Sequence, residues 1–296
     1  MARIGVIGAG KWGSALAFAL SEKNEVYITS RTPRDLDNFV TLEEILKLEY
    51  LVIAIPAQQI GKWLEENFVY SNQKVLVAAK GIEATTGRFL NEVYAPYVPE
   101  ENICFLSGPS FATEVMKSLP TALVINSVNE NTAGTFAGFF PSFIKTYLSN
   151  DIAGAEIAGA YKNVIAIAAG ICEGLALGKN AAASLISRGL VEMERFGMHY
   201  GARAETFTGL SGAGDLFLTA SSTMSRNFRV GLGLAKGQTQ EEILDELGEV
   251  AEGIGTSYAL HKIMQEQQLY LPIAKEVYEI LEGKVPKQSL RDLLGQ

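Results

Sequence analysis

The chain has 296 residues, of which 48% are hydrophobic and 20% charged, and its formal net charge is −8. This is the composition of a globular protein rather than a disordered one, and the length suits two domains of ordinary size. The acidic balance argues against general binding to nucleic acid, which needs a basic surface, but it leaves small anionic ligands open.

The cysteines and the apolar stretches bear on the compartment. Cys104 and Cys172 lie far apart without CxxC spacing, so they predict neither a disulfide framework nor a zinc site, and we find no other set of metal ligands. The apolar run in residues 1–10 is short and interrupted by glycines, unlike a signal peptide. Charged and amide side chains interrupt the most apolar helical stretch, residues 155–178. We therefore expect a cytoplasmic protein without membrane insertion.

The first half of the chain alternates short β-rich runs with helical stretches. The expected strands span residues 4–7, 25–29, 50–55, 74–79, 103–106, 121–126 and 144–148, with a weak strand or turn at 38–40. The expected helices span residues 14–21, 41–47, 58–66, 88–94, 111–116 and 130–139. Thr41 and Glu44 have the spacing of a capping box. The alternation predicts an α/β fold with a Rossmann-type, doubly wound and mainly parallel sheet.

After residue 150 the pattern becomes helical. The expected helices span residues 152–177, 180–199, 205–208, 227–235, 239–247, 254–265 and 271–281. We predict a dinucleotide-binding domain over residues 1–150 and an all-α substrate and catalytic domain over residues 151–296. The apolar second domain is compatible with a homodimer.

The motif GAGKWG over residues 8–13 follows the first expected strand and opens a helix. Gly8 permits a tight turn, Gly10 lets the backbone approach a pyrophosphate, and Gly13 lets helix and strand pack closely. The helix N-terminus then offers N–H groups to the anion. The alternative is a tight turn without a ligand.

The end of the second strand bears on the choice of cofactor. An acidic residue there would bind the ribose of NADH, but residues 30–34 contain none. Arg31 could instead pair with a 2′-phosphate, which slightly favours NADPH while NADH stays open. The alternative is a solvated loop arginine.

Two further strand ends carry candidate site residues. Lys80 follows the fourth expected strand, where ligands of open α/β sheets bind, although a surface lysine fits the position equally well. The segment SGPSFA over residues 107–112 also follows a strand and opens a helix, so its backbone could face nicotinamide or substrate.

Lys162 lies within the apolar helical stretch of the second half. Burial lowers the pKa of a lysine and suits it to proton transfer. The alternative is a lysine whose stem is buried and whose ammonium group reaches solvent.

A second block of motifs follows. A glycine-rich turn over residues 209–214 could direct Asp215 into a cleft. Ser225, Arg226 and Asn227 open another helix, where an anion would meet N–H groups and a guanidinium, the alternative being a serine cap beside an exposed arginine. The two histidines, at positions 199 and 261, are expected to be structural.

Taken together and in this order, these motifs resemble those of the bacterial-type NAD(P)-dependent glycerol-3-phosphate dehydrogenases. The resemblance runs nearly end to end, through VIGAGKWGSALA, KG, SGPSFATE, YKNVIAIAAGI, SGAGDLFLT, SRN and a closing LPI followed by VY. It implies reversible reduction of dihydroxyacetone phosphate to sn-glycerol 3-phosphate, which feeds glycerophospholipid synthesis.

The resemblance also implies residue roles. Lys162 would be the general acid for reduction and the base for the reverse reaction, oriented by Asp215. The implied substrate contacts are Lys80, Gly108, Ser110, Lys162, Asp215, Thr219, Ser225, Arg226 and Asn227. The implied cofactor contacts, which include the three glycines of the motif, are Gly8, Gly10, Lys11, Trp12, Gly13, Arg31, Lys80, Ala112, Arg226, Val250 and Glu252.

One departure and two alternatives accompany this reading. Residues 32–40 are shorter than the corresponding segment of most family members, and this loop borders the adenosine end of the cofactor. One alternative is a related β-hydroxyacid or ketopantoate-type reductase, which the SRN segment disfavours because it suits a phosphate. The other is a non-catalytic NADPH-binding sensor, which Lys162 and Asp215 disfavour.

Overall fold

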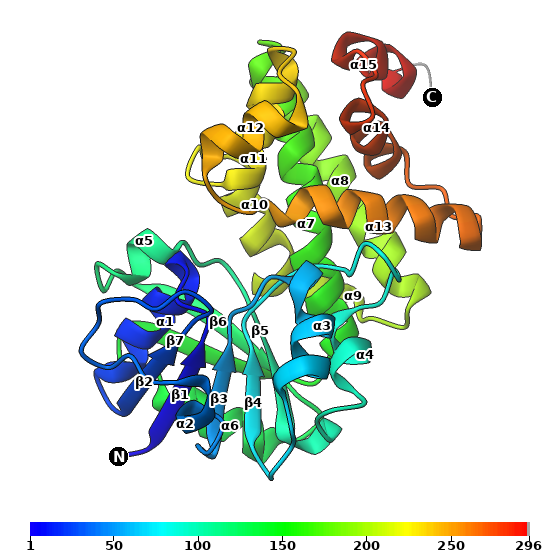
Figure 1. Ribbon diagram of the computed structural model, residues 1–296. Coiled ribbons are helices and arrows are strands. Elements are labelled where there is room, and N and C mark those ends of the chain that lie inside the picture. The colour runs from blue at the N-terminus through cyan, green and yellow to red at the C-terminus, as the bar shows by residue number, and fades with distance from the viewer. Residues whose placement is uncertain (295–296) are drawn as a thin grey trace.

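Seven short runs of β-branched and aliphatic residues form a single sheet in the computed structural model, which describes residues 1–294 (Figure 1). The strands are β1 (Arg3–Ile7), β2 (Glu25–Thr29), β3 (Tyr50–Ile53), β4 (Lys74–Val77), β5 (Ile103–Ser107), β6 (Thr121–Asn126) and β7 (Ile144–Ser149). Their order is β2-β1-β3-β4-β5-β6-β7, and every neighbouring pair is parallel except β5 with β6. The predicted Rossmann-type, mainly parallel sheet is confirmed.

Helices cover both faces of the sheet. They are α1 (Lys11–Ser21), α2 (Leu42–Ile45), α3 (Ala57–Asn67), α4 (Leu90–Tyr94), α5 (Ala112–Val115) and α6 (Glu130–Phe139), with a 3-10 turn at Glu100–Asn102. Side chains of α1, α5 and α6 share one core with alternate strand residues such as Val6 and Val52. Side chains of α2, α3 and α4 share the other core with the intervening residues, such as Ile7 and Ile53. Both faces of the central strands are therefore buried, as their continuous apolar runs predict.

Two local predictions concern the segment between β2 and α2. The capping box of α2 is present, because Thr41 Oγ1 accepts from the Glu44 N–H at 3.3 Å and Glu44 Oε2 accepts from the Thr41 N–H at 2.9 Å. The weak strand or turn expected at residues 38–40 is a turn with a single bridge between Phe39 and Ile28.

From residue 150 onward the described chain forms helices and no strand. They are α7 (Ile152–Gly174), α8 (Lys179–His199), α9 (Ala204–Thr208), α10 (Asp215–Ala220), α11 (Arg226–Ala235), α12 (Gln240–Leu247), α13 (Glu252–Gln267), α14 (Pro272–Leu281) and α15 (Pro286–Leu294). Sequence reasoning did not predict α10 or α15. The stretch expected to be a glycine-rich turn forms a π-helical turn, Leu210–Gly214. Residues 295–296 of the predicted second domain lie outside the described residues.

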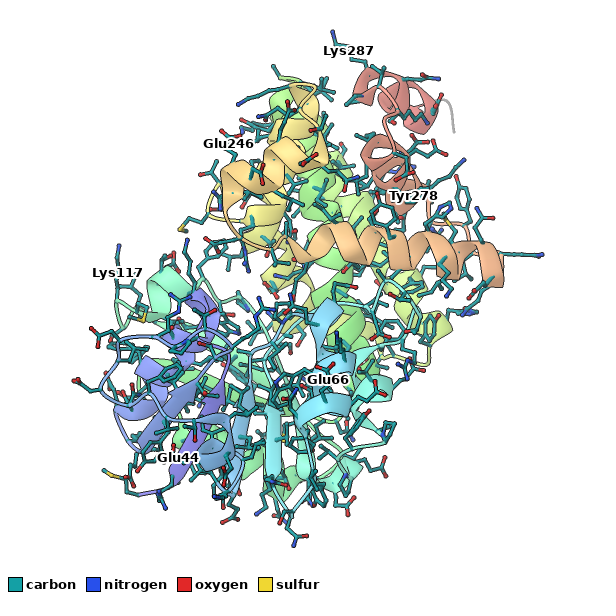
Figure 2. The ribbon with its side chains drawn as sticks, in the orientation of Figure 1. Glu44, Glu66, Lys117, Glu246, Tyr278 and Lys287 are labelled. Atoms are coloured by element: carbon teal, nitrogen blue, oxygen red, sulfur yellow. The ribbon has the colours of Figure 1, made fainter. Side chains whose placement is uncertain are left out.

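Helix α7 runs through the middle of the helical part and begins at the edge of the sheet (Figure 1). By length and composition it could cross a membrane, but 94% of its most apolar window is buried inside the fold. Its core contacts include Ile165 and Ile167, both fully buried. Charged side chains such as Glu44, Glu66 and Lys117 instead lie at the surface (Figure 2).

Helices α7 and α11 cross at backbone contact. A Cβ atom added to Gly231 would lie 2.0 Å from the carbonyl oxygen of Ile167, and one added to Gly170 would lie 2.0 Å from that of Phe228. Since neither contact involves a flexible side chain, any larger residue must separate the helices. Lys162 on α7 and Arg226 on α11 thereby take fixed relative positions.

We predict that Gly231→Ala destabilises the protein by about 3 kcal/mol, because the added methyl group must push two packed helices apart. Urea unfolding at neutral pH measures this loss. The matched control is Gly134→Ala on the exposed face of α6, where the added Cβ atom meets no atom within 4 Å. This substitution should stabilise the protein by about 0.5 kcal/mol. Equal stability of the two variants would contradict the assigned crossing.

Candidate active site

The loop between β1 and α1 is built by its three glycines. Gly8 has φ +111°, and a Cβ atom there would lie 2.6 Å from the carbonyl oxygen of Ala54. A Cβ atom on Gly13 would lie 1.8 Å from the carbonyl oxygen of Gly8, so α1 and the loop pack too closely for any side chain. Gly10 faces open space, with nothing within 4 Å of the added atom. The loop thus exposes bare backbone at its second glycine, as a pyrophosphate site requires.

The N-terminus of α1 suits an anion. Gly10 is its N-cap and provides no side-chain hydrogen bond, and the first turn contains no acidic residue. The first N–H groups of the helix therefore keep their capacity to donate to a ligand, and the helix dipole favours negative charge there. The Trp12 indole N–H donates to the Ala78 carbonyl at 3.1 Å and ties the loop to the end of β4. These features fit the pyrophosphate of a dinucleotide.

Lys80 is not a surface lysine. It follows β4, and its ammonium group donates to the Gly108 carbonyl at 3.0 Å and to Asp215 Oδ2 at 2.7 Å. Its stem crosses α7 at Gly159, where an added Cβ atom would lie 3.4 Å from Lys80 Cγ and Cδ. The side chain is only 16% exposed, so the sheet and the helical part meet around it.

Lys162 donates to the same carboxylate from the other side. Its ammonium group lies 2.6 Å from Asp215 Oδ1 and 2.8 Å from Thr219 Oγ1, and its side chain is 9% exposed. Burial, reinforced by the charge of Lys80, lowers the pKa of Lys162 to about 8, although Asp215 acts in the opposite direction. Lys162 thus combines a buried position with a pKa near neutral.

Asp215 connects the two lysines. It is the first residue of α10, directly after the π-helical turn, and its side chain is 2% exposed. Burial alone would raise its pKa, but the ammonium groups of Lys162 and Lys80 hold the pKa below its ordinary value. Two ammonium groups therefore share one buried carboxylate, and Glu252 adds a weaker attraction for Lys162.

The segment after β5 borders this cluster. Gly108 has φ +102°, and an added Cβ atom would lie 3.0 Å from the Ala122 carbonyl oxygen. Ser110 Oγ donates to the Gly108 carbonyl at 3.2 Å, and Ala112 is the first residue of α5. The Gly108 carbonyl therefore accepts from both Ser110 and Lys80.

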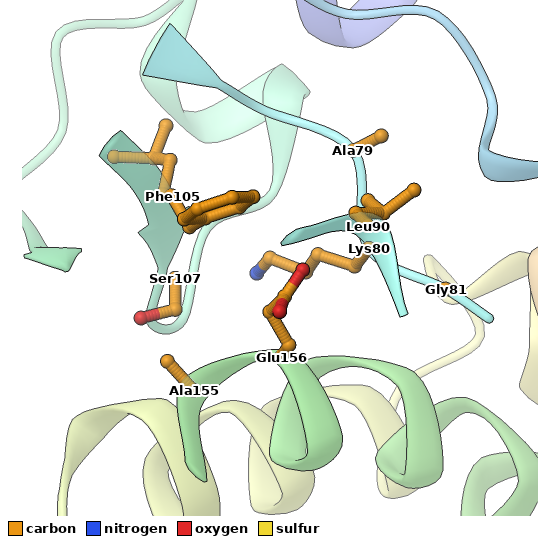
Figure 3. Close-up of a pocket in the computed structure, with 9 residues that line it drawn as sticks. Ala79, Lys80, Gly81, Leu90, Phe105, Ser107, Ala155 and Glu156 are labelled. Carbon is orange, nitrogen blue, oxygen red and sulfur yellow. The ribbon is translucent and has the colours of Figure 1, made fainter. Parts of the chain in front are cut away.

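A small cavity lies behind Lys80. Its volume of about 10 Å³ is enough for roughly one water molecule. Glu156 lines it from α7, and its carboxyl rises beside the Lys80 side chain (Figure 3). Glu156 accepts from the Asn91 N–H at 2.9 Å, while its Oε2 has no hydrogen-bond partner among the described residues. Burial raises the pKa of Glu156 to about 8, so this carboxyl is mostly neutral at pH 7.

The SRN segment begins α11. Ser225 caps the helix by accepting from the Phe228 N–H, and Asn227 Oδ1 accepts from the Gly253 N–H at 2.9 Å. The Arg226 side chain is 42% exposed and lies 3.3 Å from Glu249. The serine cap and the exposed arginine of the alternative interpretation are thus present, and binding of an anion at this helix N-terminus stays a prediction.

Residues at and just before the start of α13 also contact the N-terminal half of the chain. Glu252 accepts from the Ala57 N–H of α3 at 3.4 Å. Its pKa is raised by burial, against the effect of Arg226. Lys11 of the glycine-rich loop pairs with Glu249. Val250 is 43% exposed.

The structure thus joins Lys80, Lys162, Asp215 and Thr219 in one hydrogen-bonded group and ties Gly108 to it. Arg31 lies exposed on the loop after β2, and no hydrogen bond or ion pair of the described chain connects it with that group. The histidines make structural contacts: His199 bonds to Gln267, and His261 stacks on Tyr278.

Comparisons with known proteins cover the whole chain. Residues 23–133 match the family model for the NAD-dependent glycerol-3-phosphate dehydrogenase N-terminus, and residues 151–292 match the model for its C-terminus. The chain belongs to the NAD-dependent glycerol-3-phosphate dehydrogenase family. It is an oxidoreductase that uses NADH or NADPH.

Individual relatives agree with this assignment. The dehydrogenase is 77% identical to the glycerol-3-phosphate dehydrogenase (NAD(P)+) of Sulfurimonas denitrificans, with 100% of both chains covered. It is 62% identical to that of Nitratiruptor, covering 99% of this chain and 98% of the relative. The crystal structure of glycerol-3-phosphate dehydrogenase from Coxiella burnetii is similar with a TM-score of 0.92 at 30% identity, covering 100% and 99%.

Sequence reasoning missed two residues of the dehydrogenase's site. Glu249 pairs with both Lys11 and Arg226, but nothing in the sequence distinguishes it from other acidic loop residues. Gly159 gives room to the Lys80 stem. Its position three residues before Lys162, on the same helix face, is a signal that could have found it.

We predict that Asp215→Asn destabilises the dehydrogenase by about 3 kcal/mol at pH 7, because the buried lysine pair loses its shared counter-charge. The measurement is urea unfolding. Asp245→Asn, on an exposed face of α12, is the matched control and should change stability little.

The difference in the free energy of unfolding between wild type and Asp215→Asn should become smaller in acid. A carboxylate whose pKa is lowered by folding contributes stability above its unfolded pKa and loses it as pH falls through the folded value. If this difference in the free energy of unfolding stays constant into strong acid, the aspartate stabilises the protein by packing alone.

Proposed function

We propose that the enzyme reversibly reduces dihydroxyacetone phosphate to sn-glycerol 3-phosphate, and that it does so in the cytoplasm for glycerophospholipid synthesis. The names of its relatives, which are glycerol-3-phosphate dehydrogenases, support the substrate. The observation that carries the chemistry is the buried Lys162 ammonium, held by Asp215 beside a second lysine. Residues 1–150 bind the cofactor and residues 151–296 supply the proton and the phosphate contacts.

Proton transfer falls to Lys162. A bound nicotinamide dinucleotide supplies the hydride. The Lys162 ammonium donates a proton to the carbonyl oxygen of the substrate as negative charge develops there, and the neutral amine accepts it in the reverse reaction. Asp215 fixes the direction of this ammonium, and Lys80 holds the substrate and adds positive charge. With a pKa near 8, Lys162 can give or take the proton close to neutral pH.

The substrate phosphate binds at the N-terminus of α11. Arg226 supplies a guanidinium there, and the first turn of the helix holds no acidic residue. Asn227 joins it through the amide nitrogen, because its oxygen is bonded to Gly253. Ser225 and Thr219 complete the substrate site with Gly108 and Ser110. A phosphate held away from the reacting carbon provides binding energy that positions the carbonyl.

The cofactor lies along the glycine-rich loop. Its pyrophosphate meets the N-terminus of α1, and Arg31 pairs with a 2′-phosphate, so NADPH is slightly favoured over NADH. The remaining proposed contacts are Lys11, Trp12, Lys80, Ala112, Arg226, Val250 and Glu252. We propose small molecules as the only substrates, without nucleic acid or membrane insertion, and the helical domain is compatible with a homodimer.

The substrate is tested by following NADPH absorbance with dihydroxyacetone phosphate and, separately, with ketopantoate. We expect faster turnover of dihydroxyacetone phosphate, because Arg226 and α11 have no phosphate to bind in ketopantoate. Faster reduction of ketopantoate would reassign the enzyme to that class of reductase, and NADPH binding without turnover of either compound would indicate a sensor.

Lys162→Ala should abolish turnover and leave NADPH binding nearly intact, since the lysine acts on the substrate oxygen. In the wild type, reduction should slow as pH rises through about 8, where Lys162 loses its proton, and oxidation of glycerol 3-phosphate should accelerate over the same range. Both rates are measured spectrophotometrically across pH. Lys236→Ala, an exposed lysine after α11, is the control. Undiminished turnover of Lys162→Ala would remove the proton-transfer role.

A further inference from the structure

Glu249 bridges the two parts of the chain at the mouth of the site. It lies on the loop over residues 248–251, between α12 and α13. One carboxylate oxygen pairs with the Lys11 ammonium, and the other lies 3.3 Å from Nη1 of Arg226. A single carboxylate therefore pairs with two cations, one from each part of the fold.

Both cations stand where an anion is favoured. Lys11 is the first residue of α1 and Arg226 is the first residue of α11. Neither helix has an acidic residue in its first turn. The Glu249 carboxylate contacts the side-chain end of the first residue of each helix. A carboxylate with one oxygen on each cation makes the same kind of contact that a bridging phosphate would make.

We propose that Glu249 is an affinity-determining residue, an internal counter-anion that ligand phosphates displace from Lys11 and Arg226. The inference rests on the proposed function, which assigns Lys11 to the cofactor and Arg226 to both cofactor and substrate. A phosphate arriving at either cation meets a like charge at close range. The carboxylate must turn away, and the energy of its ion pairs is subtracted from the binding energy of the ligand.

The loop allows this movement. Gly248 ends α12 in the left-handed conformation with φ +61°, and the residue after Glu249 is 43% exposed. The Glu249 side chain itself is 23% exposed, Arg226 42% and Lys11 68%. Because these pairs are partly solvated, they are weak and easily exchanged, so the effect on affinity is several-fold rather than orders of magnitude.

The test is Glu249→Gln, which keeps the shape of the side chain and removes its charge. The Kd for NADPH is measured without substrate by nicotinamide fluorescence, and KM for dihydroxyacetone phosphate is measured by NADPH absorbance. We expect Kd to fall about fivefold at low ionic strength and the difference to shrink in high salt. If KM for dihydroxyacetone phosphate falls as well, the substrate phosphate also displaces Glu249.

The control is Glu246→Gln on the exposed face of α12, which makes the same change in net charge (Figure 2). It should leave the Kd for NADPH unchanged, so that a general charge effect is separated from the local one. Thermal unfolding of both variants shows whether the fold is kept.

Two results would overturn the proposal. Weaker NADPH binding by Glu249→Gln would show that the carboxylate stabilises the complex with the bound ligand, and that the ligand does not displace it. An unchanged Kd for NADPH would show a surface ion pair without influence on binding. If the wild type binds NADPH but does not oxidise it with dihydroxyacetone phosphate, the proposed function fails, while the comparison of Kd values still decides the role of Glu249.

Discussion

The shared carboxylate of Asp215 is the interaction on which the site depends. A buried ion left unpaired costs several kcal/mol, and here Lys80 comes from the sheet side while Lys162 comes from α7. One carboxylate pairs with both ammonium groups. The two parts of the chain are therefore held together by two ammonium groups around one buried carboxylate. The ion pairs that stabilise this contact also fix the position of the Lys162 ammonium group.

Backbone contacts give that cluster its position. The glycine-rich loop packs α1 against the sheet at a distance that admits no side chain at Gly13, and Gly159 brings the Lys80 stem onto α7. The crossing of α7 with α11 then places Arg226 relative to Lys162. Such contacts allow little adjustment, because packed backbone cannot shift as a flexible side chain does. A site made of long, mobile lysine and arginine side chains thus rests on rigid supports.

The fold was largely predictable from local patterns, and the site only in part. The strands at Glu25–Thr29 and Thr121–Asn126 have their predicted bounds, because apolar runs bounded by polar or turn residues identify buried strands. The pattern did not reveal that β6 is antiparallel to β5, since alternation does not encode strand direction. Burial of Lys162 follows from its apolar neighbours, but the approach of Lys80 depends on contacts between segments far apart in sequence. The segment before Asp215 was predicted to be an ordinary glycine-rich turn, because the contacts that shape it into a π-helical turn are not visible in the local sequence.

The charge pattern around the cleft explains how an acidic protein handles phosphorylated ligands. At the base, the ammonium groups of Lys80 and Lys162 converge on Asp215, so positive charge is concentrated there without a basic surface. At the mouth, Glu249 lowers the positive charge that Lys11 and Arg226 would otherwise present. In the proposed arrangement, Lys11 and Arg226 at the mouth therefore meet phosphate groups, and the lysines at the base meet the negative charge that develops on the carbonyl oxygen. Since binding energy raises the rate only when it is realised in the transition state, the positive charge beside that oxygen is the part of the site that serves the reaction most directly.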